Sequence, residues 1–170
     1  MVKASDKRVL VVDDEPDVRN FLRACIEDAG FNVETAKDGT ETLEKMNANV
    51  PDLITLDLVM PRQSGLQLLR RLRRNKAWAE IPVIVITAHA RDEFGSEDIK
   101  QFQAFAAGQR PKHILEKPIT PASLVKAICK ILEVEVDVTK EASEKEALKS
   151  MINDCDPEII KKIREMLSKK

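Results

Sequence analysis

Short apolar runs alternate with amphipathic stretches over the first two thirds of the chain. The runs are almost continuously apolar and often β-branched, which is typical of strands covered on both faces of a parallel sheet. They predict five strands, at 8–13, 32–36, 52–57, 82–87 and 112–115. Because a helical pattern separates each strand from the next, we expect a doubly wound α/β fold with five helices around the sheet.

Residues that typically begin a helix stand between these runs. In chain order they are Pro16, Asp38, Ser64 and the pair Thr120–Pro121. The first helix carries a predicted apolar stripe of Val18, Phe21, Leu22, Cys25 and Ile26, and Gly30 ends it. A fourth helix is expected between the last two strands.

The last part of the chain, 134–170, has a different character. It begins with the acidic spacer "EVEVDV" and continues with two helical patterns, the second of which places Ile159, Ile163 and Met166 on one face. We therefore predict one domain over 1–133 and a helical C-terminal extension over 134–170. Because isolated helices of this length are marginal, we expect the extension to dock on the domain or to bind a partner.

Composition narrows the function classes. The 170 residues carry a net charge of −1, which argues against nucleic-acid binding through bulk positive charge. The extension is too short for a winged helix, its charges nearly cancel, and DNA binding is not expected. No apolar run approaches the roughly 20 residues that span a bilayer, and the start "MVKASDKR" lacks a signal-peptide core. We expect a cytoplasmic protein without membrane contact, and its widely spaced cysteines predict reduced core thiols rather than a metal site.

The predicted strands end in residues that carry chemistry. Asp13 and Asp14 follow the first strand, Asp57 ends the third, Thr87 ends the fourth and Lys117 follows the fifth. In doubly wound folds the carboxyl ends of the strands form the functional site. Carboxylates suit a hard cation such as Mg²⁺, and one carboxylate can act as a nucleophile toward phosphorus while a lysine and a hydroxyl offset the phosphoryl charge.

Each of these residues also has an ordinary structural explanation when taken alone. A single aspartate at a strand end is usually a turn former or a helix cap, and Thr87 alone is an ordinary β-branched strand residue. Four strand ends with complementary chemistry favour a shared site. Glu15 is interpreted differently, because an acid beside Pro16 suits the start of a helix. We interpret it first as part of the helix start and only second as a neighbour of the metal site.

Residues 8 to about 132 resemble the receiver domain of two-component response regulators, similar to the stand-alone CheY-like receiver. The resemblance rests on four ordered motifs, "VVDDE" (11–15), "LDLVMPRQSG" (56–65), "VITAH" (85–89) and "LEKPI" (115–119). It implies a flavodoxin-like five-stranded parallel sheet of order 2-1-3-4-5. It also implies a signalling protein that catalyses only its own phosphorylation and dephosphorylation.

The resemblance assigns a role to each strand-end residue. Asp57 would be the phospho-acceptor, with Thr87 and Lys117 contacting the phosphoryl group. Mg²⁺ would be held by Asp13, Asp14 and Asp57 and by the backbone carbonyl of Val59. A sensor histidine kinase or a histidine phosphotransfer protein would be the donor, and the output partner is left open. A homodimer through the fourth and fifth helices or the C-terminal helices is a further expectation, as is a cis Lys117–Pro118 bond.

Three features depart from the family pattern. The stretch between Thr87 and Lys117 is longer than in most receivers. Ile114 stands where the family usually has an aromatic switch residue, and Val59 and His89 occupy positions that tune the rate of dephosphorylation. The longer stretch and Ile114 keep open a phosphorylation-insensitive scaffold. A Mg²⁺-dependent aspartyl-phosphate phosphohydrolase is the less favoured alternative, because Val59 offers no general base.

Overall fold

The computed structural model describes residues 2–58, 60, 64–87 and 113–135. In these residues the sheet consists of β1 (Arg8–Val12), β2 (Asn32–Ala36), β3 (Leu53–Asp57), β4 (Val83–Thr87) and β5 (His113–Glu116). The strands are parallel and lie in the order β2-β1-β3-β4-β5. The predicted fold and strand order are therefore confirmed, and each strand lies within one residue of its predicted bounds.

The helices begin at the predicted residues. The described elements are the short 3₁₀ helix η1 (Ala4–Asp6) and the α-helices α1 (Pro16–Asp28), α2 (Gly39–Ala48), α3 (Gly65–Arg74) and α5 (Pro121–Leu132). The side chains of Asp38, Ser64 and Thr120 each accept a hydrogen bond from a backbone N–H in the first turn of their helix. The predicted fourth helix and C-terminal helices lie outside the described residues.

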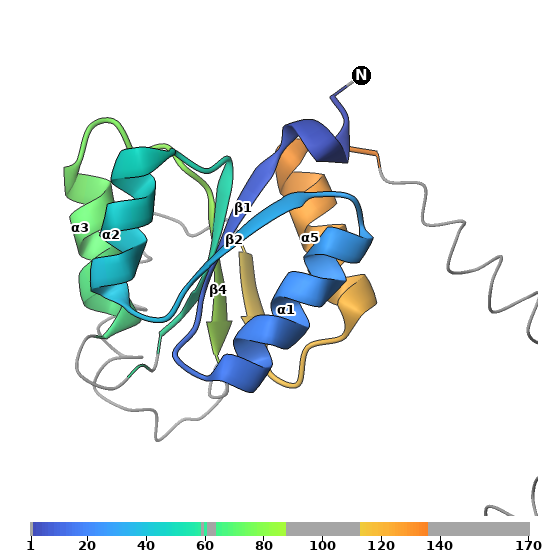
Figure 1. Cartoon of the computed structure of the whole chain (residues 1–170), viewed down its shortest axis with the longest axis horizontal. Helices are drawn as coiled ribbons and strands as arrows, with labels where there is room; N and C mark the ends of the chain where they lie inside the picture. The colour runs from blue at the N-terminus through green and yellow to red at the C-terminus, as the bar shows by residue number, and fades with distance from the viewer. Residues whose placement is uncertain (1, 59, 61–63, 88–112, 136–170) are drawn as a thin grey trace, which may run out of the picture. The chain divides into compact units, whose positions relative to one another are not determined.

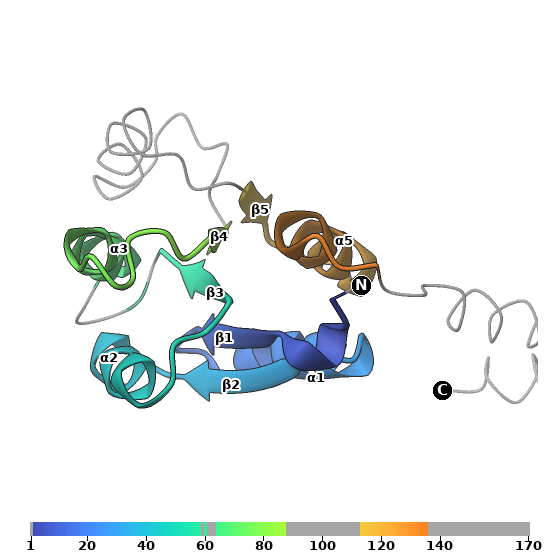
Figure 2. The ribbon, with the colours of Figure 1, turned by 90° about the horizontal axis from the view of Figure 1, so that it is seen from above.

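The sheet lies between two layers of helices (Figures 1 and 2). Alternate residues of β1 show why: Leu10 and Val12 pack in the cluster that includes residues of α2 and α3, whereas Val9 and Val11 pack in the cluster of α1 and α5. Side chains of a strand point alternately to its two faces, so a wholly apolar strand needs helices on both. The central strands β3 and β4 are buried throughout.

The register brings the carboxyl ends of the strands to one rim. Val12 pairs with Leu56, so the residues that follow β1 lie beside the end of β3. Asp57 pairs with Ile86, and Thr87 with Glu116, so the ends of β4 and β5 continue the same rim. The fold thus gathers the predicted site residues, because each of them ends a strand or follows one within two residues.

One residue of the apolar stripe predicted for α1 is exposed instead of buried. Leu22 and Ile26 are buried, but Phe21 is 44% exposed because it lies a full 100° around the helix from Leu22. Cys25 and Cys129 are half-buried and pack against the core between the sheet and the helices α1 and α5.

Val134, assigned above to the extension, is 4% exposed and packs in the same core. Within the described residues, no helix has the length and apolar character needed to cross a membrane.

Candidate functional site

Three carboxylates converge at the rim of the sheet. Asp13 and Asp14 follow β1 and Asp57 is the last residue of β3, and each offers an oxygen such that all three oxygens lie within 4.8 Å of one another. Asp13 is 1% exposed and Asp57 is 4% exposed, whereas Asp14 is half-buried. Buried carboxylates this close repel each other unless positive charge lies between them.

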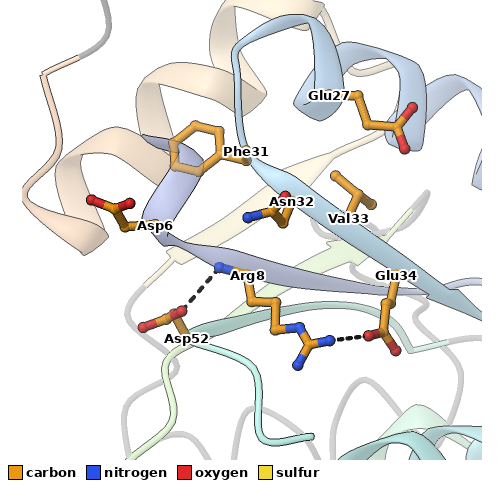
Figure 3. Close-up of a pocket in the computed structure, with 8 residues that line it drawn as sticks. All are labelled: Asp6, Arg8, Glu27, Phe31, Asn32, Val33, Glu34 and Asp52. Carbon is orange, nitrogen blue, oxygen red and sulfur yellow. Dashed lines mark hydrogen bonds and ion pairs between the residues drawn. The ribbon is translucent and has the colours of Figure 1, made fainter. Parts of the chain in front are cut away.

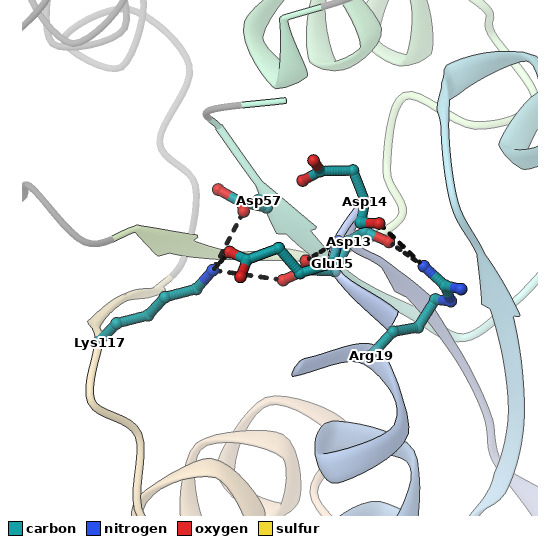
Figure 4. A network of polar contacts seen from close by, with 6 residues as sticks. All are labelled: Asp13, Asp14, Glu15, Arg19, Asp57 and Lys117. Carbon is teal, nitrogen blue, oxygen red and sulfur yellow. Dashed lines mark hydrogen bonds and ion pairs between the residues drawn. The ribbon is translucent and has the colours of Figure 1, made fainter. Parts of the chain in front are cut away.

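Lys117 supplies part of that charge (Figure 4). Its Nζ lies 3.1 Å from Asp57 Oδ2 and 3.4 Å from Asp13 Oδ2. The lysine follows β5, where its backbone N–H donates to the carbonyl oxygen of Thr87 at 2.9 Å. The Lys117–Pro118 bond is cis, as the resemblance implies. Lysine and two aspartates from three strand ends thus form one ion-pair network.

The pKa values respond to burial and to this network. Burial raises the pKa of Asp13, and Asp57 adds to that increase, while the Glu15 N–H and Lys117 oppose it. For Lys117, burial lowers the pKa, but the charges of Asp57 and Asp13 outweigh it and the pKa is raised. The lysine is therefore cationic at neutral pH and offsets part of the negative charge of Asp13 and Asp57.

The donor set fits a hard divalent cation. All three converging atoms are carboxylate oxygens, the ligands that Mg²⁺ prefers. The Asp14 side chain is partly exposed, so water and a cation can reach the cluster from its side. Thr87 is buried at the end of β4, on the rim that these residues form. Val59, expected to add a backbone carbonyl, and His89 lie outside the described residues.

A family model described as the response regulator receiver domain matches residues 9–129. The chain belongs to the response regulator receiver family. The matched residues cover all five strands of the sheet except Arg8, together with both predicted aspartate motifs, so the expected family membership is confirmed. The roles of the individual site residues of this receiver stay predictions.

Relatives of this receiver include both longer proteins and single domains. The alkaline phosphatase synthesis transcriptional regulatory protein PhoP of Bacillus subtilis is 34% identical over 121 residues, which are 66% of this chain and 50% of PhoP. An uncharacterized 14.6 kDa protein of Leptolyngbya boryana is 32% identical over 121 residues, 71% of this chain and 86% of that protein. The solved structure of chemotaxis protein CheY4 of Vibrio cholerae is 30% identical with a TM-score of 0.62, covering 74% of this chain and 98% of CheY4. The receiver therefore spans half the length of PhoP.

Two residues beside the aspartates make contacts that the sequence did not predict. Glu15 is the N-cap residue of α1, as expected, but its side chain makes no capping bond and its Oε1 lies 3.7 Å from Lys117 Nζ. Arg19 of α1 was not predicted as a site residue, yet its Nη1 donates to the carbonyl oxygens of Asp13 and Asp14. The only sequence signal was its place one turn into the helix that follows the acidic triplet.

A glycine allows the start of α3 to lie close to the end of β3. The Gly65 N–H donates to the carbonyl oxygen of Leu58 at 3.0 Å. A Cβ at residue 65 would lie 2.1 Å from the backbone oxygen of Asp57 and 2.8 Å from the Cα of Leu58. Only glycine permits this approach, so Gly65 helps to fix the backbone that carries Asp57.

A surface pocket of about 580 Å³ lies away from the rim, at the amino ends of β1 and β2 (Figure 3). Its polar groups already have partners: the Arg8 guanidinium pairs with Glu34, and the Arg8 backbone N–H donates to Asp52 Oδ2 at 2.9 Å. None of its lining residues belongs to the aspartate cluster. We assign no part of the receiver chemistry to this pocket.

Proposed function

We propose that this receiver accepts a phosphoryl group on Asp57 and thereby switches its contacts with a partner protein. The donor is a phosphohistidine of a sensor histidine kinase or of a histidine phosphotransfer protein in the cytoplasm. The observation that carries the proposal is the convergence of the Asp13, Asp14 and Asp57 oxygens within 4.8 Å, with Lys117 Nζ 3.1 Å from Asp57 Oδ2.

The reaction follows from the chemistry of these groups. A carboxylate oxygen of Asp57 forms the new O–P bond while the N–P bond of the donor phosphohistidine breaks, and the imidazole nitrogen keeps the electron pair. Lys117 offsets the negative charge of the phosphoryl oxygens from its place beside Asp57. The hydroxyl of Thr87 donates to a phosphoryl oxygen. The protein is otherwise not an enzyme.

The metal part of the proposal assigns Mg²⁺ to the carboxylates of Asp13, Asp14 and Asp57 and to the backbone carbonyl of Val59. When bound, Mg²⁺ supplies positive charge that neutralises the phosphoryl oxygens as the group is transferred. The carboxylates bind and orient the cation. Three carboxylates converge here, and Lys117 forms its ion pairs with two of them, Asp13 and Asp57, which supports the assignment.

A protein partner rather than DNA is proposed for the output. PhoP is named a transcriptional regulatory protein, but 134–170 carry nearly balanced charge and no aromatic or base-reading pattern. A homodimer through the fourth and fifth helices or the C-terminal helices is one form that this output can take. The second candidate function is a phosphorylation-insensitive scaffold, favoured by Ile114, which is 48% exposed on β5 in place of an aromatic residue.

Beryllofluoride, which mimics a phosphoryl group, tests the proposal when added with Mg²⁺ to the full chain. We expect changes in amide NMR signals that are concentrated in 88–114, and their loss in Asp57→Asn. The exposed Asp17 of α1 provides a matched control, since Asp17→Asn should respond like the wild type. No response in the wild type would favour the scaffold, and steady turnover of phosphate esters would favour the phosphohydrolase.

A further inference from the structure

All three carbonyl oxygens of the acidic triplet accept hydrogen bonds from one residue. Arg19 Nη1 donates to the carbonyl oxygens of Asp13 at 2.8 Å and Asp14 at 3.3 Å. The backbone N–H of Arg19 donates to the carbonyl oxygen of Glu15 at 2.9 Å. In Figure 4 Arg19 and Lys117 approach the aspartates from opposite directions. One arginine therefore binds the backbone of the triplet, while Lys117 pairs with the side chains of Asp13 and Glu15.

A hydrogen bond within the acidic triplet also fixes the backbone of residues 13–15. The Glu15 N–H donates to Asp13 Oδ1 at 2.9 Å, which ties one oxygen of the buried carboxylate to the backbone two residues later. Because a peptide group is planar, fixing the direction of a carbonyl also fixes the plane from which the neighbouring side chains project. The bonds from Arg19 thus set the directions in which the Asp13 and Asp14 side chains leave the backbone.

We propose that Arg19 is a positioning residue for the cation site: it holds the backbone so that the carboxylates of Asp13 and Asp14 converge on the cation. This inference rests on the proposed binding of Mg²⁺ at the cluster. Groups that orient metal ligands without touching the metal typically contribute 10- to 100-fold to metal affinity. Both side-chain bonds come from a single guanidinium nitrogen, Nη1, which carries two N–H groups and so donates to two acceptors at once.

Charge alone predicts the opposite effect. Arg19 is a half-buried cation next to a site for a divalent cation, so its removal would lessen repulsion and strengthen Mg²⁺ binding. Positioning predicts that removal weakens binding. The sign of the change in Mg²⁺ affinity therefore separates the two roles, whatever the effect on stability.

The experiment is an NMR titration of the full chain with Mg²⁺ at constant ionic strength, comparing wild type with Arg19→Met and Arg19→Lys. We expect Arg19→Met to weaken binding by roughly 10-fold and Arg19→Lys to weaken it less. The Glu15 amide should also exchange its hydrogen faster in Arg19→Met, because the turn loosens. Should Arg19→Met fail to fold, Arg19→Lys still tests the inference: it keeps the charge, so an effect of charge alone predicts unchanged Mg²⁺ binding, whereas positioning predicts weaker binding.

Arg23, one turn later on α1, provides the matched control. Its Nε pairs with Glu27 at 2.8 Å on the exposed side of the helix, so Arg23→Met should leave Mg²⁺ binding unchanged. Unchanged or tighter binding in both Arg19 variants overturns the inference but not the proposed function. A wild-type chain that binds no Mg²⁺ overturns both.

Discussion

Two threonines of this fold bury their hydroxyl groups in different ways. Thr55 in β3 is 1% exposed, and its Oγ1 has no hydrogen-bond partner among the groups that the structure describes. Thr42 in α2 is 0% exposed, and its Oγ1 donates to the carbonyl oxygen of Asp38 at 2.7 Å. A buried hydroxyl without a partner costs about 1–3 kcal/mol, whereas a paired one contributes about 1 kcal/mol.

We therefore predict opposite effects of the same substitution. Thr55→Val should raise the free energy of unfolding by about 1 kcal/mol, because it removes an unpaired hydroxyl at nearly constant shape. Thr42→Val should lower it by about 1 kcal/mol, because it removes a paired one. Urea unfolding at pH 7 measures both. Equal losses in the two variants would show that the Thr55 hydroxyl is satisfied.

The site residues differ in how far a sequence can reveal them. Asp13, Asp57 and Lys117 were predicted because each interrupts or follows an apolar run, and the ends of parallel strands meet at one rim. Arg19 was missed because its role depends on where a long, flexible side chain points, which spacing does not encode. The contact between the exposed Glu15 carboxylate and Lys117 could not be predicted, for the same reason.

The sequence predicted the helices and strands more reliably than it predicted which residues at the border of a buried face are themselves buried. Apolar runs define strands sharply, and Pro16, Asp38 and Ser64 mark helix starts through local hydrogen bonding and fixed dihedral angles. Phe21 shows the limit: a residue 100° from the centre of an apolar stripe is buried only if a neighbouring element covers it. The exposed fraction of its side chain is 44%.

The start of α2 combines several local interactions. Asp38 Oδ1 accepts from the Glu41 N–H at 2.8 Å, and Glu41 Oε2 accepts from the Lys37 N–H at 3.1 Å. Glu41 also pairs with Lys45 at 3.3 Å. The Lys37 N–H chiefly lowers the pKa of Glu41 below its ordinary value of 4.5, and Lys45 lowers it further, against the effect of burial. These interactions favour the charged carboxylate in the folded state.

This arrangement predicts a pH-dependent stabilisation by Glu41. Because the folded pKa is depressed, the stabilisation is complete well above pH 4.5 and is lost as the pH falls through the folded pKa. At pH 7, Glu41→Gln should lower the free energy of unfolding by roughly 0.5 kcal/mol, since the pair is partly solvated. Urea unfolding between pH 3 and pH 7 should show the variant approaching the wild type as the pH falls. A constant difference across this range would contradict the prediction.

At the scale of the whole molecule, the near-neutral net charge conceals a local imbalance. The chain carries a net charge of −1, yet Asp13, Asp14 and Asp57 converge at one rim, with the exposed Glu15 beside the same Lys117 that pairs with Asp57. Folding brings these carboxylates together, so their repulsion opposes folding and a bound cation relieves it. Stability and cation binding should therefore be coupled through the same residues.

Asp14→Asn separates these two contributions. Asp14 is the half-buried member of the cluster, whereas Lys117 contacts Asp13 and Asp57, so the variant removes one repelling charge and keeps both ion pairs. Without Mg²⁺, its free energy of unfolding should exceed that of the wild type by roughly 1 kcal/mol. Mg²⁺ at ten times its dissociation constant should stabilise the wild type by about 1.4 kcal/mol and Asp14→Asn by much less. Urea unfolding at matched ionic strength tests both, with Asp17→Asn as the control. An equal response to Mg²⁺ in Asp14→Asn and the wild type would place the cation elsewhere.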